Sequence, residues 1–125
     1  STLCVNYCLL FCDYIKIKNA AELSEILDDL QIDNVIGKTW TTDAIYKETI
    51  NNRNARKSDG CLCVEMECAG LQAICSYRNL ELYQFLFGGD LLGDSSWARG
   101  TLGTDKEKSQ QMSCFELALK IAEKI

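Results

Sequence analysis

The most informative pattern of apolar and polar positions lies in residues 60–70. Residues 61–64 are apolar and follow a glycine, which predicts a short buried β-strand. Glu65 and Glu67 come next, and apolar positions then recur at helical spacing. These positions are Met66, Ala69, Gly70, Ala73, Ile74 and Tyr77. The pattern therefore predicts a strand that delivers two carboxylates into the first turn of a helix, where no hydrophobic core requires them.

A second apolar run follows this helix. Asn79 breaks the helical pattern, and residues 82–87 predict another strand, which ends at a glycine turn before Asp90. The chain is therefore expected to contain a strand-helix-strand unit. Because ligands of open α/β sheets bind at the carboxyl ends of the strands, we expect Asp90 to lie at that edge.

Further elements are predicted on both sides of this unit. Asn19 and Glu22 have the spacing of a helix cap, and the helix that follows has one apolar face. Residues 34–42 favour a strand, after which a functional loop is expected to start near Thr42 or Asp43. Residues 47–59 are polar and basic, which predicts an exposed helix or loop.

The C-terminal part predicts a loop and then a helix. Residues 91–103 contain three glycines and an isolated Trp97, which indicates a long loop of the kind that covers a site. Thr104 and Glu107 have capping-box spacing before the last helix. Its predicted buried stripe consists of Met112, Phe115, Ala118, Leu119 and Ala122. Residues 1–13 are mostly apolar, and their pattern fits either a buried strand or a hydrophobic helix.

Composition and charge narrow the possible functions. The chain has 125 residues, 47% of them hydrophobic and 25% charged, which is typical of one soluble globular domain. The longest apolar stretch, residues 7–11, is too short to span a membrane. A net charge of −5 without a block of basic residues argues against a nucleic-acid partner.

The chain has eight cysteines, which could serve in core packing, metal binding or disulfide bonds. Four of them, Cys61, Cys63, Cys68 and Cys75, lie in the apolar strand and helix, where a thiol acts as a small hydrophobe. The chain has no histidine and no C-x-x-C pair, so we expect no metal site. Regular helices and strands can form a core without disulfides, which favours the reducing cytoplasm.

Three blocks of the sequence resemble the nucleoside phosphorylase family, which includes purine nucleoside phosphorylase and uridine phosphorylase. They are residues 40–49 (WTTDAIYKET), residues 64–70 (VEMECAG) and residues 88–90 (GGD). The resemblance covers residues 14–125 and leaves 1–13 as a non-matching apolar segment. It implies an α/β fold with a three-layer sheet flanked by helices. It also implies cleavage of the bond between nucleobase and ribose by inorganic phosphate as co-substrate, or by water in related hydrolases, without another cofactor.

The resemblance assigns roles to the acidic block. Glu67 would accept hydrogen bonds from the ribose hydroxyls, and Met66 would pack against the sugar face. A carboxylate at a helix N-terminus is held ionised by the free amides, and its two oxygens suit a vicinal diol. Glu65 would be either a second substrate contact or a structural partner. Ile45 and Tyr46 fall where the family places residues beside the base.

Asp90 aligns with the acid that assists departure of the base in the purine-cleaving branch. A carboxyl group at an apolar strand end is suited to general acid catalysis of this kind. The alternative is that Asp90 is simply a turn aspartate.

The N-terminal half of the family, which supplies the phosphate contacts, has no counterpart in this sequence. We therefore expect a phosphorylase-like domain truncated to its C-terminal half and inactive alone, with a separate phosphate-binding half as a potential partner. The alternative is a non-catalytic remnant that binds nucleosides or forms oligomers. Because half a sheet leaves an unpaired edge, we expect a homo-oligomer with residues 1–11 in the interface.

Overall fold

The protein folds into two compact units, Ser1–Leu86 and Phe87–Ile125, which are described separately here. The structure is a computed structural model and describes residues 3–10, 13–93 and 96–125, with side chains from Tyr14 onward. Among these residues no helix is long and apolar enough to cross a membrane.

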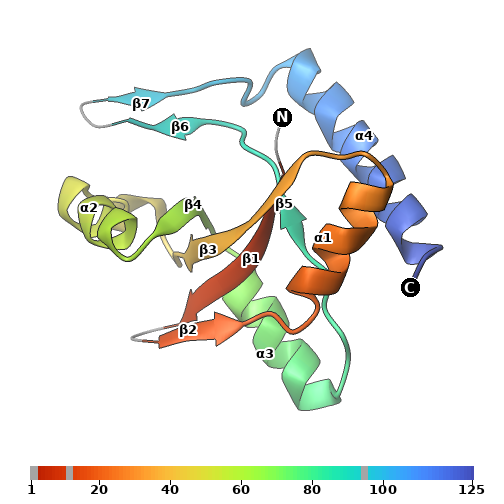
Figure 1. Ribbon diagram of the computed structural model, residues 1–125. Helices are drawn as coiled ribbons and strands as arrows, with labels where there is room; N and C mark the ends of the chain where they lie inside the picture. Colours follow the sequence, from red (N-terminus) through yellow and green to blue (C-terminus); the bar gives the residue numbers. More distant parts are fainter. Residues whose placement is uncertain (1–2, 11–12, 94–95) are drawn as a thin grey trace. The chain divides into compact units, whose positions relative to one another are not determined.

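The first unit is built on a mixed β-sheet with the strand order β2-β1-β3-β4 (Figure 1). Its strands are β1 (Leu3–Leu10), β2 (Asp13–Lys16), β3 (Asn34–Thr41), β4 (Cys61–Glu65) and β5 (Phe85–Leu86). Strands β1, β3 and β4 run parallel, whereas β2 and β5 both pair antiparallel to β1.

Residues 3–10 of the N-terminal segment form the strand β1, which decides between the strand and the helix left open by the sequence pattern. β1 pairs with β3 along one side and with β2 and β5 along the other. Its backbone edges are therefore used within the chain. This removes the unpaired edge on which we based the expected assembly through residues 1–11, and a homo-oligomer stays a prediction.

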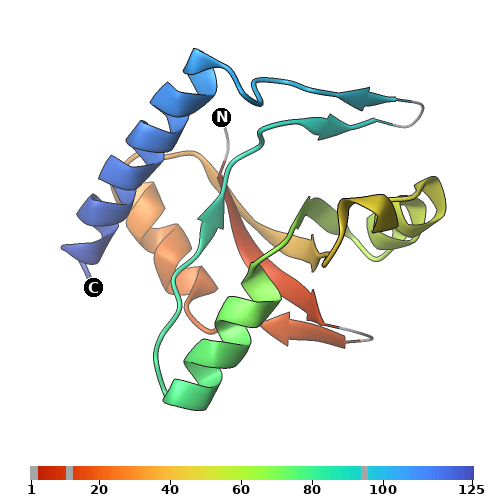
Figure 2. The same cartoon turned by 180° about the vertical axis from the view of Figure 1, so that it is seen from behind.

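Helices cover both faces of this sheet. They are α1 (Ala20–Asp29) and α3 (Cys68–Arg78), and the unit also contains the 3-10 turn η1 (Ile45–Lys47) and the helix α2 (Ile50–Ser58). Figure 1 shows α1 in front of the sheet, and Figure 2 shows α3 in front when the unit is turned round. Thr39 and Trp40 are neighbours in β3, so their side chains point to opposite faces of the sheet. Both side chains are buried, which shows that both faces are covered at this point. The unit is therefore an α/β fold, as expected.

The α1 helix confirms its sequence pattern but not its predicted cap. Leu23, Ile26 and Leu27 are buried and form much of the core. The Asn19 side chain makes no capping hydrogen bond and instead donates to the Leu82 carbonyl at 3.4 Å. Glu22 accepts a hydrogen bond from the Tyr83 hydroxyl at 2.7 Å. The predicted cap residues therefore tie α1 to the segment that precedes β5, a contact that local spacing does not reveal.

The predicted buried strand, β4, is an edge strand of the sheet. Its Leu62 side chain is 57% exposed and leans over Gly37, where an added Cβ would come within 2.1 Å of Leu62 Cδ1. The predicted apolar face of α3 is buried only at its start. Cys68, Ala69 and Gln72 are buried, whereas Tyr77 is 90% exposed. The apolar positions at helical spacing therefore do not form one buried face, because only the first turns of α3 are buried.

The direction of β5 also differs from the prediction. A strand-helix-strand unit would place the carboxyl end of its second strand at the ligand-binding edge. β5 is only two residues long, and it pairs antiparallel with Cys4 and Val5 near the start of β1. The chain therefore leaves the sheet at the amino ends of β1 and β3, opposite to the carboxyl ends of β3 and β4.

The second unit contains a short hairpin and a helix. The hairpin consists of β6 (Leu91–Leu92) and β7 (Trp97–Ala98), where we expected a long loop. The helix is α4 (Asp105–Ala122), and its predicted cap is confirmed, because Thr104 Oγ1 accepts the Glu107 N–H at 3.3 Å.

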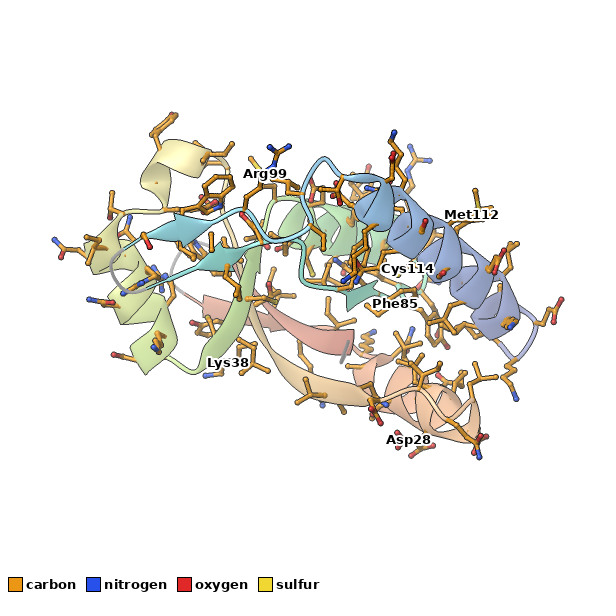
Figure 3. All side chains as sticks on the ribbon, turned by 90° about the horizontal axis from the view of Figure 1, so that it is seen from above. Asp28, Lys38, Phe85, Arg99, Met112 and Cys114 are labelled. Carbon is orange, nitrogen blue, oxygen red and sulfur yellow. The ribbon has the colours of Figure 1, made fainter. Side chains whose placement is uncertain are left out.

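The predicted buried stripe of α4 was wrong. Met112, Phe115 and Leu119 are 60%, 61% and 53% exposed, and Ala118 and Ala122 are exposed as well. The more buried positions are Cys114, Leu117 and Ile121. Met112 and Cys114 lie on different sides of the helix in Figure 3. The helix carries apolar residues on two faces, so periodicity alone could not decide which face is covered.

Candidate functional site

The carboxyl ends of β3 and β4 lie side by side and bring two predicted blocks together. The strands are paired up to Thr41 and Glu65, and the Thr42 N–H donates to the Glu65 carbonyl at 2.9 Å. The loop after β3 and the turn after β4 therefore start from adjacent positions. Five of the six predicted site residues lie at or just after these two strand ends. Ile45 and Tyr46 come after β3, and Glu65 ends β4 before Met66 and Glu67.

The loop after β3 presents apolar side chains to solvent. Thr42 is buried, and its hydroxyl donates to the Ala44 carbonyl at 3.1 Å, which fixes the start of the loop. Ile45 and Tyr46 follow in η1 and are 73% and 82% exposed. Met66, in the turn after β4, is 44% exposed. Large apolar groups held in the open beside polar groups are suited to contact a ligand.

An exposed ion pair lies in the same loop. Lys47 Nζ lies 2.7 Å from Asp43 Oδ1. The hydrogen bond to Lys47 lowers the pKa of Asp43, and the same bond raises the pKa of Lys47. Since both groups are solvated, the pair contributes little to stability.

Glu65 lies at the end of β4 and caps helix α3. Its Oε2 accepts the N–H groups of Glu67 at 2.8 Å and of Cys68 at 2.6 Å. The Thr41 hydroxyl donates to its other oxygen, Oε1, and Thr41 Oγ1 accepts the Ala69 N–H at 3.2 Å. The amides at the start of α3 are thus bound by the side chains of two neighbouring strands.

Glu67 stands outside this arrangement. It occupies the N-cap position of α3, where its side chain makes no capping hydrogen bond. Its carboxylate accepts the Met66 N–H at 3.3 Å, and the residue is exposed. We expected the helix amides to hold the Glu67 carboxylate, but they hold that of Glu65. The reason is that β4 ends at Glu65, so that both acids precede the first turn of α3 and the side chain of Glu65 reaches forward to its amides.

Asp90 belongs to the second unit and is exposed in a turn directly before β6. The indole Nε1–H of Trp97 donates to its Oδ2 at 2.5 Å. Asp90 follows the end of β5 at Leu86 and lies in a turn, as expected. β5 runs antiparallel to β1, however, so the expectation that this strand ends at the carboxyl edge of the parallel strands was wrong.

A polar cluster at the other end of β4 was missed by the sequence analysis. The Tyr14 hydroxyl donates to Asp59 Oδ2 at 3.1 Å and lies 3.2 Å from Cys61 Sγ. Lys38 Nζ lies 4.5 Å from the centroid of the Tyr14 ring, and Arg56 pairs with Asp59 at 3.0 Å. Burial raises the pKa of Tyr14, as does its hydrogen bond to Cys61, and burial also raises the pKa of the Cys61 thiol. This cluster connects β2, β3, α2 and β4.

The described cysteines are thiols, and no metal-binding group is found in the described part of the chain. Five of them are not in disulfide bonds, namely Cys61, Cys63, Cys68, Cys75 and Cys114. Cys68 is buried, and the other four are half-buried. No set of three or more cysteine, aspartate or glutamate side chains among residues 14–93 and 96–125 is arranged to hold an ion.

Comparison with known proteins adds one finding. A family model described as the phosphorylase superfamily matches residues 14–125. A search of curated proteins found no match. The matched range includes β3, β4 and α3, and it also includes the hairpin and helix of the second unit.

Proposed function

The chain belongs to the phosphorylase superfamily, and we propose that the carboxyl ends of β3 and β4 bind the ribose of a nucleoside. The observation that carries this proposal is the exposed carboxylate of Glu67 next to Met66 in the turn after β4, together with the exposed side chains of Ile45 and Tyr46 in the loop after the neighbouring strand β3. In this family the chemistry is phosphorolysis of the bond between base and sugar. The described edge therefore offers a polar acceptor and an apolar platform of the kinds that a nucleoside requires.

The sugar and the base would use different parts of this edge. Two oxygens of an ionised carboxylate accept two hydrogen bonds, so Glu67 can bind the 2′- and 3′-hydroxyls together. The Met66 thioether is flexible and polarisable, which suits packing against the sugar face. Ile45 and Tyr46 would contact the base, and Tyr46 can stack against it.

The finer parts of the proposal concern chemistry. We propose that Asp90 protonates the departing base and that the phosphate contacts come from residues outside these 125. The chain alone would then bind nucleosides without phosphorolysis.

A non-catalytic binding role is a second candidate. It is favoured by the Trp97 hydrogen bond, which engages the Asp90 carboxylate in the turn directly before β6.

Calorimetry with inosine, adenosine and uridine tests the binding proposal. We expect Glu67→Ala to weaken ribonucleoside binding about tenfold or more, because at least one hydrogen bond to a charged group is lost. Glu25→Gln, an exposed acid on α1, is the matched control and should leave binding unchanged. Equal affinities for inosine and its 2′,3′-dideoxy analogue would refute ribose recognition by Glu67.

A phosphorolysis assay with inosine and inorganic phosphate tests the finer parts. Release of base by the chain alone would show that the phosphate contacts do not have to come from elsewhere. If turnover occurs, Asp90→Asn separates the two candidates. Loss of turnover with retained binding supports the role of Asp90 as acid, and unchanged turnover supports a turn residue.

A further inference from the structure

The start of helix α3 is occupied by side chains of the protein itself. Three consecutive amides, those of Glu67, Cys68 and Ala69, donate to Glu65 or Thr41. Thr41 also donates its hydroxyl proton to Glu65, and the two residues are paired across β3 and β4. We refer to Thr41 and Glu65 as the Thr41–Glu65 clamp.

This clamp fills a position that would otherwise attract an anion. The first amides of a helix have no partner within the helix and bind carboxylates or phosphates. Here Glu65 Oε2 receives two of them at 2.8 and 2.6 Å. Cys68 is fully buried, so its amide could not turn to water if Glu65 were removed. The α3 N-terminus is therefore satisfied without a ligand.

The same hydrogen bonds restrict what Glu65 can do for a substrate. An ionised carboxylate has about four acceptor positions, and three donors already occupy Glu65. The residue is also half-buried, whereas Glu67 is exposed. A ribose hydroxyl could bind Glu65 only by displacing amides of its own helix.

We propose that Glu65 is a positioning residue, which holds the turn that presents Met66 and Glu67 but does not itself contact the ribose. This inference rests on the proposed function. Both ends of the turn are fixed by the clamp, because Glu65 ends β4 and its carboxylate binds the amide of Glu67. Thr41 has the same role from the neighbouring strand, since its oxygen binds the amide of Ala69.

The conservative variants distinguish positioning from direct contact. In Glu65→Gln the amide oxygen can still accept both N–H groups, and the Thr41 hydroxyl can turn to accept from the new NH₂ group. We expect it to keep ribonucleoside affinity within about threefold, whereas Glu65→Ala should weaken it about tenfold. Thr41→Val should weaken binding and Thr41→Ser should restore it. A loss in Glu65→Gln as large as in Glu65→Ala would overturn the proposal, because it would require the charge of Glu65 at the substrate.

Amide hydrogen exchange without any ligand provides an independent measurement. Glu65→Ala should speed exchange at Glu67 and Cys68, and Thr41→Val should speed it at Ala69, while Glu65→Gln leaves all three protected. Leu71, whose N–H donates to the Glu67 carbonyl, reports whether the helix itself persists. Unchanged exchange in Glu65→Ala would overturn the clamp. Failure of the wild type to bind any nucleoside would instead overturn the proposed function, and the exchange result would remain interpretable.

Discussion

Two alanines of α3 provide the sharpest test of how this helix packs. Ala69 and Ala73 are four residues apart, so they lie on nearly the same side of the helix, and both belong to its apolar pattern. In the structure Ala69 is 2% exposed, whereas Ala73 is exposed. Leucine at each position therefore makes a matched pair that differs in the space available.

The expected difference follows from that space. Ala69→Leu adds three heavy atoms where there is no room, and overpacking of this kind costs about 1–3 kcal/mol of unfolding free energy. Ala73→Leu places the same atoms in solvent, and because the helix propensities of alanine and leucine are similar, its effect should stay within about 0.5 kcal/mol. With a urea m-value of about 2 kcal/mol/M, the two midpoints should differ by about 1 M.

Equilibrium urea unfolding in a Trp97→Phe background is the appropriate assay. The chain has two tryptophans, Trp40 in the first unit and Trp97 in the second. Without Trp97, the tryptophan fluorescence comes from the buried Trp40 alone and reports on the unfolding of the first unit. Equal shifts of the midpoint in the two leucine variants would refute the conclusion that α3 is buried only at its start. A larger loss in Ala73→Leu would indicate that α3 is buried beyond its first turns.

Two further predictions concern pH and capping. The folded-state pKa of Tyr14 is raised, so its contribution to stability is present below about pH 10 and is lost as the pH rises further. Between about pH 10 and 11, Tyr14→Phe should therefore lose less unfolding free energy than the wild type, and parallel losses in urea titrations would contradict this. Thr104→Ala should cost about 0.5–2 kcal/mol by removing the cap of α4. Ser109→Ala on the same helix should be nearly neutral, because its exposed hydroxyl only donates to the Asp105 carbonyl of the preceding turn. Circular dichroism during thermal unfolding measures the stability of the Thr104→Ala and Ser109→Ala variants. Equal losses in the two variants would argue against the cap.

The sequence predicted those features that depend on local spacing. Helix α1 and the Thr104 cap of α4 follow from residues within one or two turns of each other, so their patterns are legible in the chain. The same holds for the end of β3 at Thr41, just before the expected loop. The family resemblance assigned Ile45 and Tyr46 to the same site as the Glu65–Glu67 block. In the structure the two segments start from adjacent ends of the parallel strands β3 and β4.

Features that depend on distant partners were not predictable in this way. The exposed stripe of α4 and the partial burial of α3 depend on what covers each helix, and periodicity gives only the candidate faces. The direction of β5 depends on its pairing with β1, about 80 residues earlier. The clamp depends on the register that sets Thr41 opposite Glu65, which lies 24 residues away.

Glu65 and Glu67 show why two identical side chains cannot be given their roles from sequence. If strand geometry continued through both, they would point to the same face and compete for one task. The strand instead ends at Glu65, which stays half-buried against three donors, while Glu67 lies exposed at the N-cap. Loss of the first carboxylate would leave the buried Cys68 amide unpaired, and loss of the second would leave no buried group unpaired. Folding therefore requires an acceptor at position 65, while the acid at position 67 has no comparable structural duty and is the one free to bind a ligand.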